Sequence, residues 1–265
     1  IYNFLSKTFL RKNIKNELRV KVWNDLISKS CANSDRILIV NPGIFPDDLS
    51  MLCYKLTPHL MAYNYDSVAR VGMPTNYEKI YKEVFSFDDG DIKKYGFKHA
   101  PNFNYISETP LITDDNLEHL AFTIQSIDYE RMHILSKIAD AFDLIGAYNY
   151  LFLIKDKPHR DVNKNIHFID HYKSLNEVEK YTQNSKIIID LIRVEQSGLS
   201  FRFYEAMAYQ KKMITTNANV KNYDFYNPNN ILVIDENHVE ISKEFLESPY
   251  QPLPEEIYKK YTCTN

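Results

Sequence analysis

The sequence predicts an α/β protein with two Rossmann-like domains, and three observations lead to this prediction. Apolar β-type segments alternate with helical segments through residues 36–95, and a second series of the same kind fills residues 120–234. A polar, irregular stretch with two prolines, residues 97–118, separates the two series. Strands that alternate with helices form parallel sheets with helical crossovers, so each series predicts one such sheet. We expect the two domains to face each other across a cleft.

The first series contains three strands and three helices whose ends carry turn or capping residues. Asn41-Pro42-Gly43 ends the first strand, Pro46-Asp47-Asp48 begins the next helix, and Asp88-Asp89 caps the third helix. The expected strands are 36–40, 59–63 and 84–87, and the expected helices are 46–56, 77–81 and 88–95.

The second series is longer, and most residues of its expected strands are apolar. Its expected strands are 120–124, 148–154, 166–169, 186–190, 213–216 and 231–234. Its expected helices are 129–142, 175–183 and a short helix around Glu205. The two series predict domains at residues 1–110 and 111–240, followed by a helical tail, 241–265, that packs back across the domains.

Residues 3–29 have the apolar spacing of a long helix. Its predicted apolar face consists of Leu5, Phe9, Ile14, Leu18, Val22, Leu26 and Ile27. The other face is basic, so the helix is a candidate for contact with an anionic membrane surface, and a solvated basic face is the alternative. The chain begins with Ile1 and not with Met, so we expect further residues upstream of the first domain.

Composition limits the classes of function. Of the 265 residues 44% are hydrophobic, which is enough for a packed core. The net charge of −3 gives no support to nucleic-acid binding, and we therefore expect no nucleic acid among the partners. Three distant cysteines without a C-x-x-C pair argue against a disulfide scaffold and fit a reducing compartment. No apolar run reaches the roughly 18 residues of a membrane span.

Residues 197–217 hold the strongest indication of a binding site. A turn of small residues opens a short helix in which a single acid, Glu205, stands among small and apolar neighbours. A carboxylate there is costly unless it is paired, and vicinal ribose hydroxyls suit it because it accepts two hydrogen bonds. Backbone N–H groups at a helix start suit a diphosphate. The segment predicts half of a nucleotide-sugar site, with pairing of Glu205 to Arg202 or Lys212 as the alternative.

Four neighbouring residues are candidates for the same site. Arg193 lies at a strand end, where a guanidinium could bind phosphates bidentately. Arg202 stands three residues before Glu205, so it either joins the site or pairs with that acid on the helix. Thr215 and Thr216 could bind phosphate or base, or they simply end a buried strand.

The sequence resembles a known family in both halves. Residues 198–217 resemble the donor-site signature of GT-B glycosyltransferases, and residues 223–235 resemble bacterial proteins of lipopolysaccharide or capsular polysaccharide biosynthesis. The segments 63–67 and 84–96 also fit that family. The resemblance implies a two-domain GT-B fold that holds a nucleotide sugar mainly in the second domain, with no bound metal and no other cofactor.

The resemblance also implies roles for single residues. The helix glutamate of the family maps onto Glu205, which would accept the ribose hydroxyls. The turn of Ser197, Gly198, Leu199 and Ser200 would lie against the diphosphate or the donor sugar. In many retaining GT-B enzymes another glutamate stands eight positions before the ribose-binding one, and here that position is Ser197. This departure leaves the stereochemistry of transfer open.

Sugar transfer needs a stabilised leaving diphosphate and a base for the acceptor hydroxyl. Arg193 and Arg202 are the candidates for the first task, because both flank the turn that precedes the Glu205 helix. Asp66, at the end of a predicted strand in the first domain, is the candidate base, and a turn cap is its alternative. The predicted function is a cytoplasmic glycosyltransferase that extends a surface glycan or a lipid-linked glycan. The alternatives are a nucleotide-sugar epimerase or hydrolase, and a non-catalytic protein that binds sugar nucleotides.

Overall fold

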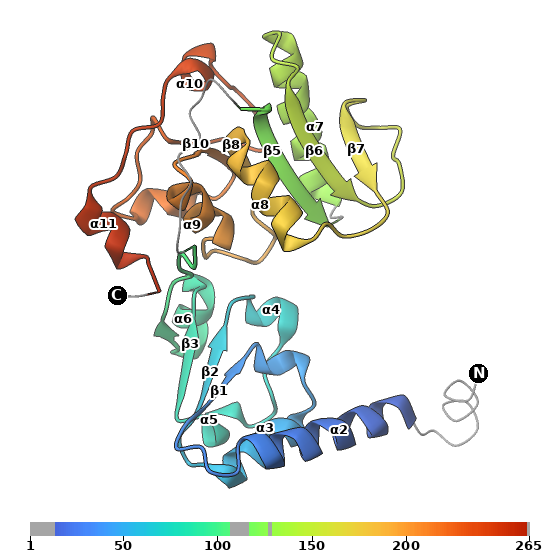
Figure 1. Ribbon diagram of the computed structural model, residues 1–265, viewed down its shortest axis with the longest axis vertical. Helices are drawn as coiled ribbons and strands as arrows, with labels where there is room; N and C mark the ends of the chain where they lie inside the picture. The colour runs from blue at the N-terminus through green and yellow to red at the C-terminus, as the bar shows by residue number, and fades with distance from the viewer. Residues whose placement is uncertain (1–13, 107–116, 127–128, 264–265) are drawn as a thin grey trace. The chain divides into compact units, whose positions relative to one another are not determined.

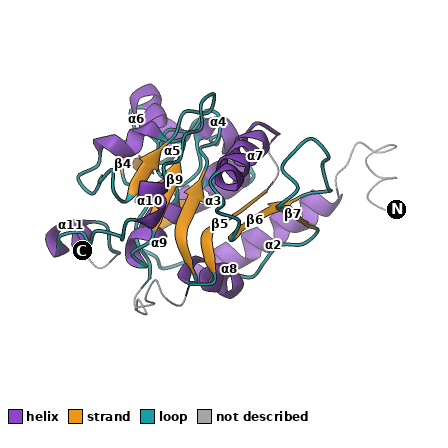
Figure 2. Cartoon of the chain, turned by 90° about the horizontal axis from the view of Figure 1, so that it is seen from above, coloured by secondary structure: helices purple, strands orange, loops and turns teal. Residues whose placement is uncertain are grey.

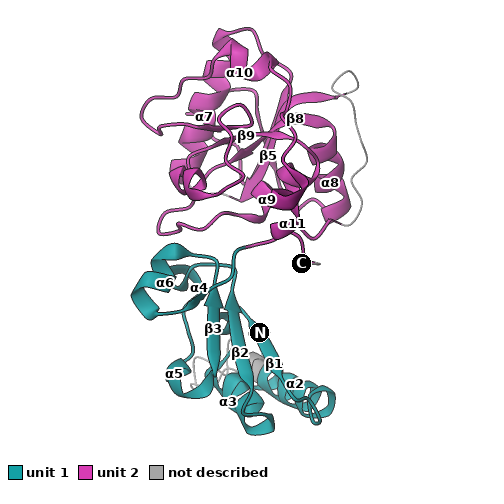
Figure 3. Ribbon diagram, turned by 90° about the vertical axis from the view of Figure 1, so that its left-hand side faces the viewer, with its two compact units in different colours: residues 1–101 teal, residues 102–265 magenta. Residues whose placement is uncertain are grey.

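The computed structural model describes residues 14–106, 117–126 and 129–263. The chain divides into two compact units, Ile1–Pro101 (unit 1) and Asn102–Asn265 (unit 2), which Figure 3 colours separately. The boundary predicted at residue 110 lies outside the described residues, so the predicted domain limits stay predictions. Within the described ranges, no helix combines the length and apolarity that crossing a membrane requires.

Unit 1 is a parallel sheet in the order β1-β2-β3-β4, with helices between its strands (Figure 1). Its strands are β1 (Ile37–Val40), β2 (Leu60–Asn64), β3 (Glu83–Ser86) and β4 (Lys98–His99). Its helices are α2 (Ile14–Ser30), α3 (Asp47–Leu56), α4 (Val68–Val71), α5 (Tyr77–Ile80) and α6 (Asp89–Tyr95), with the short η1 (Pro42–Ile44).

One face of this sheet carries the core of unit 1. Ile39 of β1 and Leu60 of β2 are buried, and they cluster with Cys53 of α3. The alternate residues of β1 point the other way, and Leu38 and Val40 are 53% and 40% exposed. Parallel strands that follow one another in chain order, with right-handed crossovers, place their helices on the same face. The strand order therefore accounts for the uncovered face.

Helix α2 confirms part of the predicted N-terminal helix, because residues 1–13 lie outside the described residues. Its predicted apolar face was wrong at Leu18, Val22 and Leu26, which are all exposed, and was confirmed at Ile27. Ile27 packs against the core of unit 1 together with Trp23, which was not expected on that face. The spacing of apolar residues was helical, but the side of the helix that docks is set by its partner α3.

Unit 2 is a six-stranded parallel sheet in the order β10-β9-β8-β5-β6-β7. Its strands are β5 (His119–Ser126), β6 (Tyr150–Lys155), β7 (Ile166–Ile169), β8 (Ser185–Asp190), β9 (Lys212–Thr215) and β10 (Ile231–Val233). Its helices are α7 (Tyr129–Leu144), α8 (Leu175–Gln183), α9 (Phe201–Ala208), α10 (Lys243–Glu247) and α11 (Glu255–Lys260), with the short η3 (Ala218–Asn222).

Both faces of the unit 2 sheet are covered. Helices α7 and α10 pack on one face, and α8, α9 and α11 pack on the other. Figure 2 shows α7 and α8 on opposite sides of β5. Successive residues of β8 consequently enter different cores, as Ile187 does on one face and Ile188 on the other. The predicted tail, 241–265, contributes to both cores through α10 and α11.

The strands and helices expected after residue 30 are confirmed, with ends that shift by no more than two residues. Besides the short η1 and η3, two elements were not expected. β4 pairs with β3 inside the stretch that had looked like a linker, and α4 follows the end of β2. Both are too short to show a periodic pattern.

Candidate functional site

The sheet of unit 2 has a point where the strand order reverses. The chain adds β6 and β7 on one side of β5 and then returns to add β8, β9 and β10 on the other side. In open α/β sheets, ligands bind in the crevice beyond the carboxyl ends of the strands at this point. β5 ends at Ser126 and β8 ends at Asp190, so these two residues flank the crevice.

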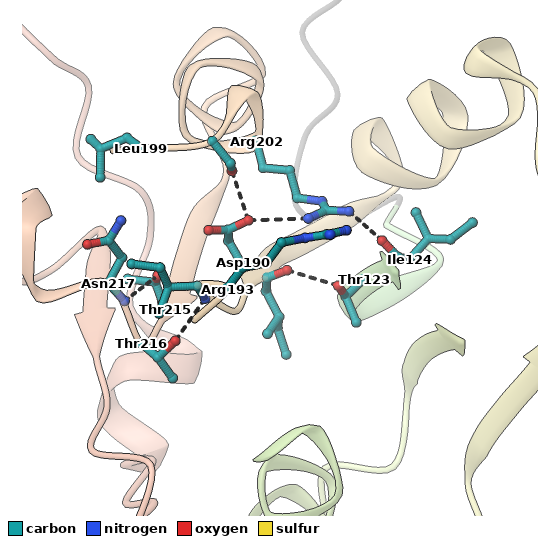
Figure 4. A network of polar contacts seen from close by, with 12 residues as sticks. Thr123, Ile124, Asp190, Arg193, Leu199, Arg202, Thr215, Thr216 and Asn217 are labelled. Carbon is teal, nitrogen blue, oxygen red and sulfur yellow. Dashed lines mark hydrogen bonds and ion pairs between the residues drawn. The ribbon is translucent and has the colours of Figure 1, made fainter. Parts of the chain in front are cut away.

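Asp190 is a buried acid, with its side chain 5% exposed. Its Oδ1 accepts hydrogen bonds from Ser200 Oγ at 2.8 Å and from Arg202 Nη1 at 3.2 Å (Figure 4). Arg202 also donates through Nη2 to the backbone carbonyl of Ile124 in β5. A carboxylate removed from water needs such partners. Asp190 thus fixes the start of α9 against the ends of β5 and β8.

The residues beyond these strand ends line a small cavity of about 60 Å³ that is open to solvent. Three guanidinium groups line it, those of Arg131, Arg193 and Arg202, and among its described lining residues the one carboxylate is Asp190. Arg131 lies in the first turn of α7 and is 4% exposed, while Arg193 donates to Ser126 Oγ at 3.2 Å. Three positive charges against one negative charge make this cavity suitable for an anion.

The turn between β8 and α9 is held in place by the side chain of Asn217. Asn217 Nδ2 donates to the carbonyls of Ser197 at 3.3 Å and Gly198 at 3.1 Å. Ser200 is the N-cap of α9, but its hydroxyl bonds Asp190 and makes no cap bond. Glu195 adopts a left-handed backbone with φ 63°, which is uncommon for a residue with a side chain. The positive end of α9 thus lies at the cavity on a firmly held loop.

The structure brings part of the predicted site together. Arg193, Gly198, Ser200 and Arg202 line the cavity. The other predicted residues of the turn and of β9 make backbone contacts beside it, and their predicted contact with the nucleotide stays a prediction. Those residues are Ser197, Leu199, Thr215 and Thr216.

Thr215 and Thr216 hold loops in place. Thr215 is fully buried, and its Oγ accepts from the backbone N–H of Asn217 at 3.0 Å. Thr216 Oγ accepts from the backbone N–H of Ile192 at 2.9 Å, which fixes the chain just after β8. Both hydroxyls therefore stabilise the conformation of the chain at the strand ends.

Glu205 lies on the next turn of α9 after Arg202 and is half-buried. The alternative pairings weighed for it were wrong. Arg202 bonds Asp190, and Lys212 is fully buried and donates to Phe245 O at 2.6 Å. The partner of Glu205 is Tyr105, whose hydroxyl donates to Oε1 at 2.5 Å. Local spacing suggested Arg202, but α9 docks with that residue turned toward the sheet.

Asp66 belongs to unit 1 and follows the end of β2. Its carboxylate forms an ion pair with Arg70 and accepts from Asn41 Nδ2 at 3.4 Å. Asn41 has a left-handed backbone with φ 48° at the end of β1. A Cβ placed on Gly43 would lie 2.2 Å from the carbonyl oxygen of Gly72, so these loops require glycine to approach each other. The catalytic role of Asp66 stays a prediction.

Sequence reasoning missed six lining residues of the cavity, among them Asp190, Arg131 and Asn217. Asp190 carried a usable signal, because it is the first polar residue after the apolar run of a buried strand. Asn217 belongs to the polar residues that follow the apolar part of β9 and stands two residues after the strand ends. Arg131 had no such signal, since an arginine in the first turn of a helix is usually solvated.

Comparisons with known proteins give a fold and no family. No protein-family model matches the sequence, and no curated protein matches it. Among solved structures, the chain is similar to an alpha-glucosyltransferase in complex with UDP and a 13-mer DNA, with a TM-score of 0.56 and 13% identity over 81% of this chain and 70% of that one. A second is an alpha-glucosyltransferase with UDP-glucose and DNA containing an abasic site, with a TM-score of 0.53 and 15% identity over 81% and 71%.

These structures correct one prediction. The exclusion of nucleic acid as a partner was wrong, because proteins of similar fold were solved with DNA bound. Net charge is a property of the whole surface, whereas nucleic-acid binding depends on local clusters of cationic side chains. The likeness in fold confirms the other expectation, that the chain is an α/β protein with two Rossmann-like parallel sheets of the GT-B type.

Proposed function

We propose that the protein is a glycosyltransferase that binds a nucleoside diphosphate sugar in the cavity of unit 2. The observation that carries this proposal is the set of three guanidinium groups at the point where the strand order reverses. Similar structures hold UDP and UDP-glucose, which supports uridine diphosphate as the leaving group. The alternative of a non-catalytic binding protein shares this cavity and is separated by the assay below.

The phosphates of the donor would be held by Arg131, Arg193 and Arg202. Guanidinium groups bind phosphate oxygens bidentately, and together with the start of α9 they supply positive charge without a metal ion. Glu205 stands three residues after Arg202, and side chains at this spacing are neighbours on a helix surface. We place the ribose of the donor at the Glu205 carboxylate, which lies on α9 one turn beyond the cavity residue Arg202.

The reaction breaks the bond between the sugar C1 and the phosphate oxygen of the donor. It forms a bond from C1 to the acceptor oxygen, and the acceptor proton passes to a base. The arginines stabilise the negative charge on the departing diphosphate. Asp66 is the proposed base, because its carboxylate lies at a strand end of unit 1. The anomeric configuration of the product shows whether the configuration at C1 is inverted or retained.

We consider two candidate acceptors of the sugar. The resemblance of residues 198–217 and 223–235 to polysaccharide biosynthesis proteins supports a surface glycan. The second candidate is DNA, because similar structures contain it. The three free cysteines, Cys31, Cys53 and Cys263, agree with a cytoplasmic location, where disulfides are rare.

Calorimetric titration with UDP tests the donor site. Arg193→Ala is expected to weaken UDP binding about tenfold, as for a lost charge-assisted hydrogen bond to phosphate, and to leave the weak binding of uridine unchanged. Arg19→Ala removes an exposed arginine of α2 and is the control. Equal affinity of the Arg193→Ala and wild-type proteins for UDP would place the phosphates elsewhere.

Turnover with UDP-glucose separates transfer from the alternatives. Release of UDP that depends on an added glycan or DNA duplex indicates transfer to that acceptor, and release without an acceptor indicates hydrolysis. Asp66→Asn is expected to preserve UDP binding and to lower turnover at least about a hundredfold, the usual contribution of a general base. Full turnover in that variant would remove Asp66 as the base.

A further inference from the structure

The first residues of unit 2 form a segment, Asn102–Ile106, that lies against α9 and the C-terminal helix. Asn102 Nδ2 donates to Leu199 O at 2.9 Å, and the ring of Phe103 contacts Phe201 edge-on at 5.8 Å. On the other side, Asn104 Nδ2 donates to the Tyr258 hydroxyl at 2.6 Å. Contacts on both sides fix the position of this segment.

Tyr105 extends from this segment to two half-buried residues of α9. Its ring contacts Phe201 edge-on at 6.0 Å, and its hydroxyl donates to Glu205 Oε1 at 2.5 Å. Burial, together with the neighbouring Glu205 carboxylate, raises the pKa of Tyr105. The phenol therefore stays protonated and keeps donating at all physiological pH values.

One bond from Tyr105 does not exhaust the Glu205 carboxylate. Its two oxygens offer about four acceptor positions, and a ribose diol uses two of them. A free glutamate side chain loses rotamer freedom when it is ordered by a ligand. A hydrogen-bond donor of the protein that orders the carboxylate before the nucleotide arrives removes that entropy cost from the binding step.

We propose that Tyr105 is a positioning residue that holds the Glu205 carboxylate in the orientation that accepts the ribose hydroxyls. The inference rests on the proposed function, because it assigns the ribose to Glu205. It extends the donor site to a segment of the chain that precedes α9 by about a hundred residues and that the sequence pattern had placed in a linker.

The test compares UDP with 2′-deoxy-UDP, which lacks one of the two hydroxyls. The wild-type protein is expected to bind UDP about tenfold more tightly than 2′-deoxy-UDP, as for a lost hydrogen bond to a charged group. Tyr105→Phe retains the ring contact with Phe201 and removes only the hydroxyl. In this variant the preference for UDP is expected to fall to about threefold, with 2′-deoxy-UDP bound nearly as before.

A matched control lies at the other end of the same helix. The Tyr209 hydroxyl donates to Glu179 Oε1 at 2.6 Å, so Tyr209→Phe deletes an equivalent bond to a different carboxylate. It is expected to preserve the tenfold preference. A general loosening of α9 would instead change the binding of both nucleotides in both variants, and that result would overturn the positioning role.

The remaining outcomes are distinguishable. If Tyr105→Phe keeps the full preference for UDP, Tyr105 does not position Glu205, and the proposed function stands. If Tyr105→Phe binds UDP more tightly than the wild type, the hydroxyl competes with the ribose and the inference is wrong in sign. If the wild-type protein shows no preference, Glu205 does not hold the ribose. Absence of UDP binding by the wild type would overturn the proposed function and the inference together.

Discussion

The two units build parallel sheets from similar elements but arrange their strands differently. In unit 1 the strands follow chain order, and the helices α2, α3 and α5 share one core on one face. In unit 2 the order reverses between β5 and β8, and helices cover both faces. A reversal sends successive crossovers to opposite faces, and it opens a crevice between the two strands where it occurs.

The difference in strand order explains why charged side chains surround a cavity in unit 2. Asp190, Arg193 and Arg202 meet at the reversal in unit 2, around a small cavity of about 60 Å³. At the strand ends of unit 1, Asn41, Asp66 and Arg70 bond one another. Of the two strand-end clusters, the one in unit 2 is therefore the place to expect the donor, and the one in unit 1 supplies at most single side chains to the reaction.

The largest expected effect tests whether one face or both faces of each sheet are buried. Ile187→Ala and Ile188→Ala in β8 should each lower the free energy of unfolding by about 2–5 kcal/mol, because neighbouring residues of this strand enter two different cores. In β1, Ile39→Ala should cost a similar amount, and Leu38→Ala no more than about 0.5 kcal/mol, since Leu38 is 53% exposed.

Urea unfolding can be followed in each unit separately. The single tryptophan, Trp23, packs on the core of unit 1, so its fluorescence reports that unit. Hydrogen exchange of β8 reports unit 2. If Leu38→Ala destabilises unit 1 as much as Ile39→Ala does, the outer face of β1 is covered in solution and the contrast between the sheets disappears.

A smaller effect is expected from the two acids at the strand ends. The Asp190 side chain is 5% exposed and that of Asp66 is 20% exposed. Asp190→Asn should lower the free energy of unfolding of unit 2 by about 2 kcal/mol, because it leaves Arg202 without its buried charged partner. Asp66→Asn should change that of unit 1 by less than about 1 kcal/mol, as for an exposed ion pair.

Hydrogen exchange of β8 and Trp23 fluorescence during urea unfolding measure these two changes in the same experiment. The reverse order of costs would mean that the Asn41, Asp66 and Arg70 cluster is the better buried of the two. The better-buried strand-end cluster would then be the one in unit 1 and not the one in unit 2.

Much of the fold could be predicted from sequence because its signals are local. β7 and α8 were found at their exact limits, since each is a run with one clear period between polar residues. β4 was missed because two residues carry no period, and it exists only through pairing with β3. The docking side of α2 was also missed in part, because apolar residues lie on more than one of its faces.

The site was predicted in part for a related reason. The turn at 197–200 and the acid Glu205 are encoded within one short segment. The partners of that segment are distant in sequence. Asp190 lies twelve residues before Arg202, and Tyr105 lies one hundred residues before Glu205. Such pairs depend on how α9 docks, and the spacing of residues within one helix cannot reveal that orientation.

The smallest expected effect concerns how the helices begin. In unit 2, Glu177 closes a capping box at the start of α8, where its Oε2 accepts from the backbone N–H and the hydroxyl of Ser174, both at 2.8 Å. These bonds hold the pKa of Glu177 at about 2, with the backbone bond as the largest cause. In unit 1, α3 begins at Pro46 without a side-chain cap bond.

Because the folded pKa of Glu177 is depressed, its contribution to stability is present above the unfolded pKa of about 4.3 and is lost as the pH falls toward 2. Glu177→Gln should therefore speed hydrogen exchange in α8 at pH 7, and this difference from the wild type should shrink below about pH 4. Ser174→Ala removes the hydroxyl but keeps the backbone donor, so it should have part of the same effect. A difference that stays constant from pH 7 to pH 3 would show that the carboxylate charge does not contribute, and that α8 begins no more firmly than α3.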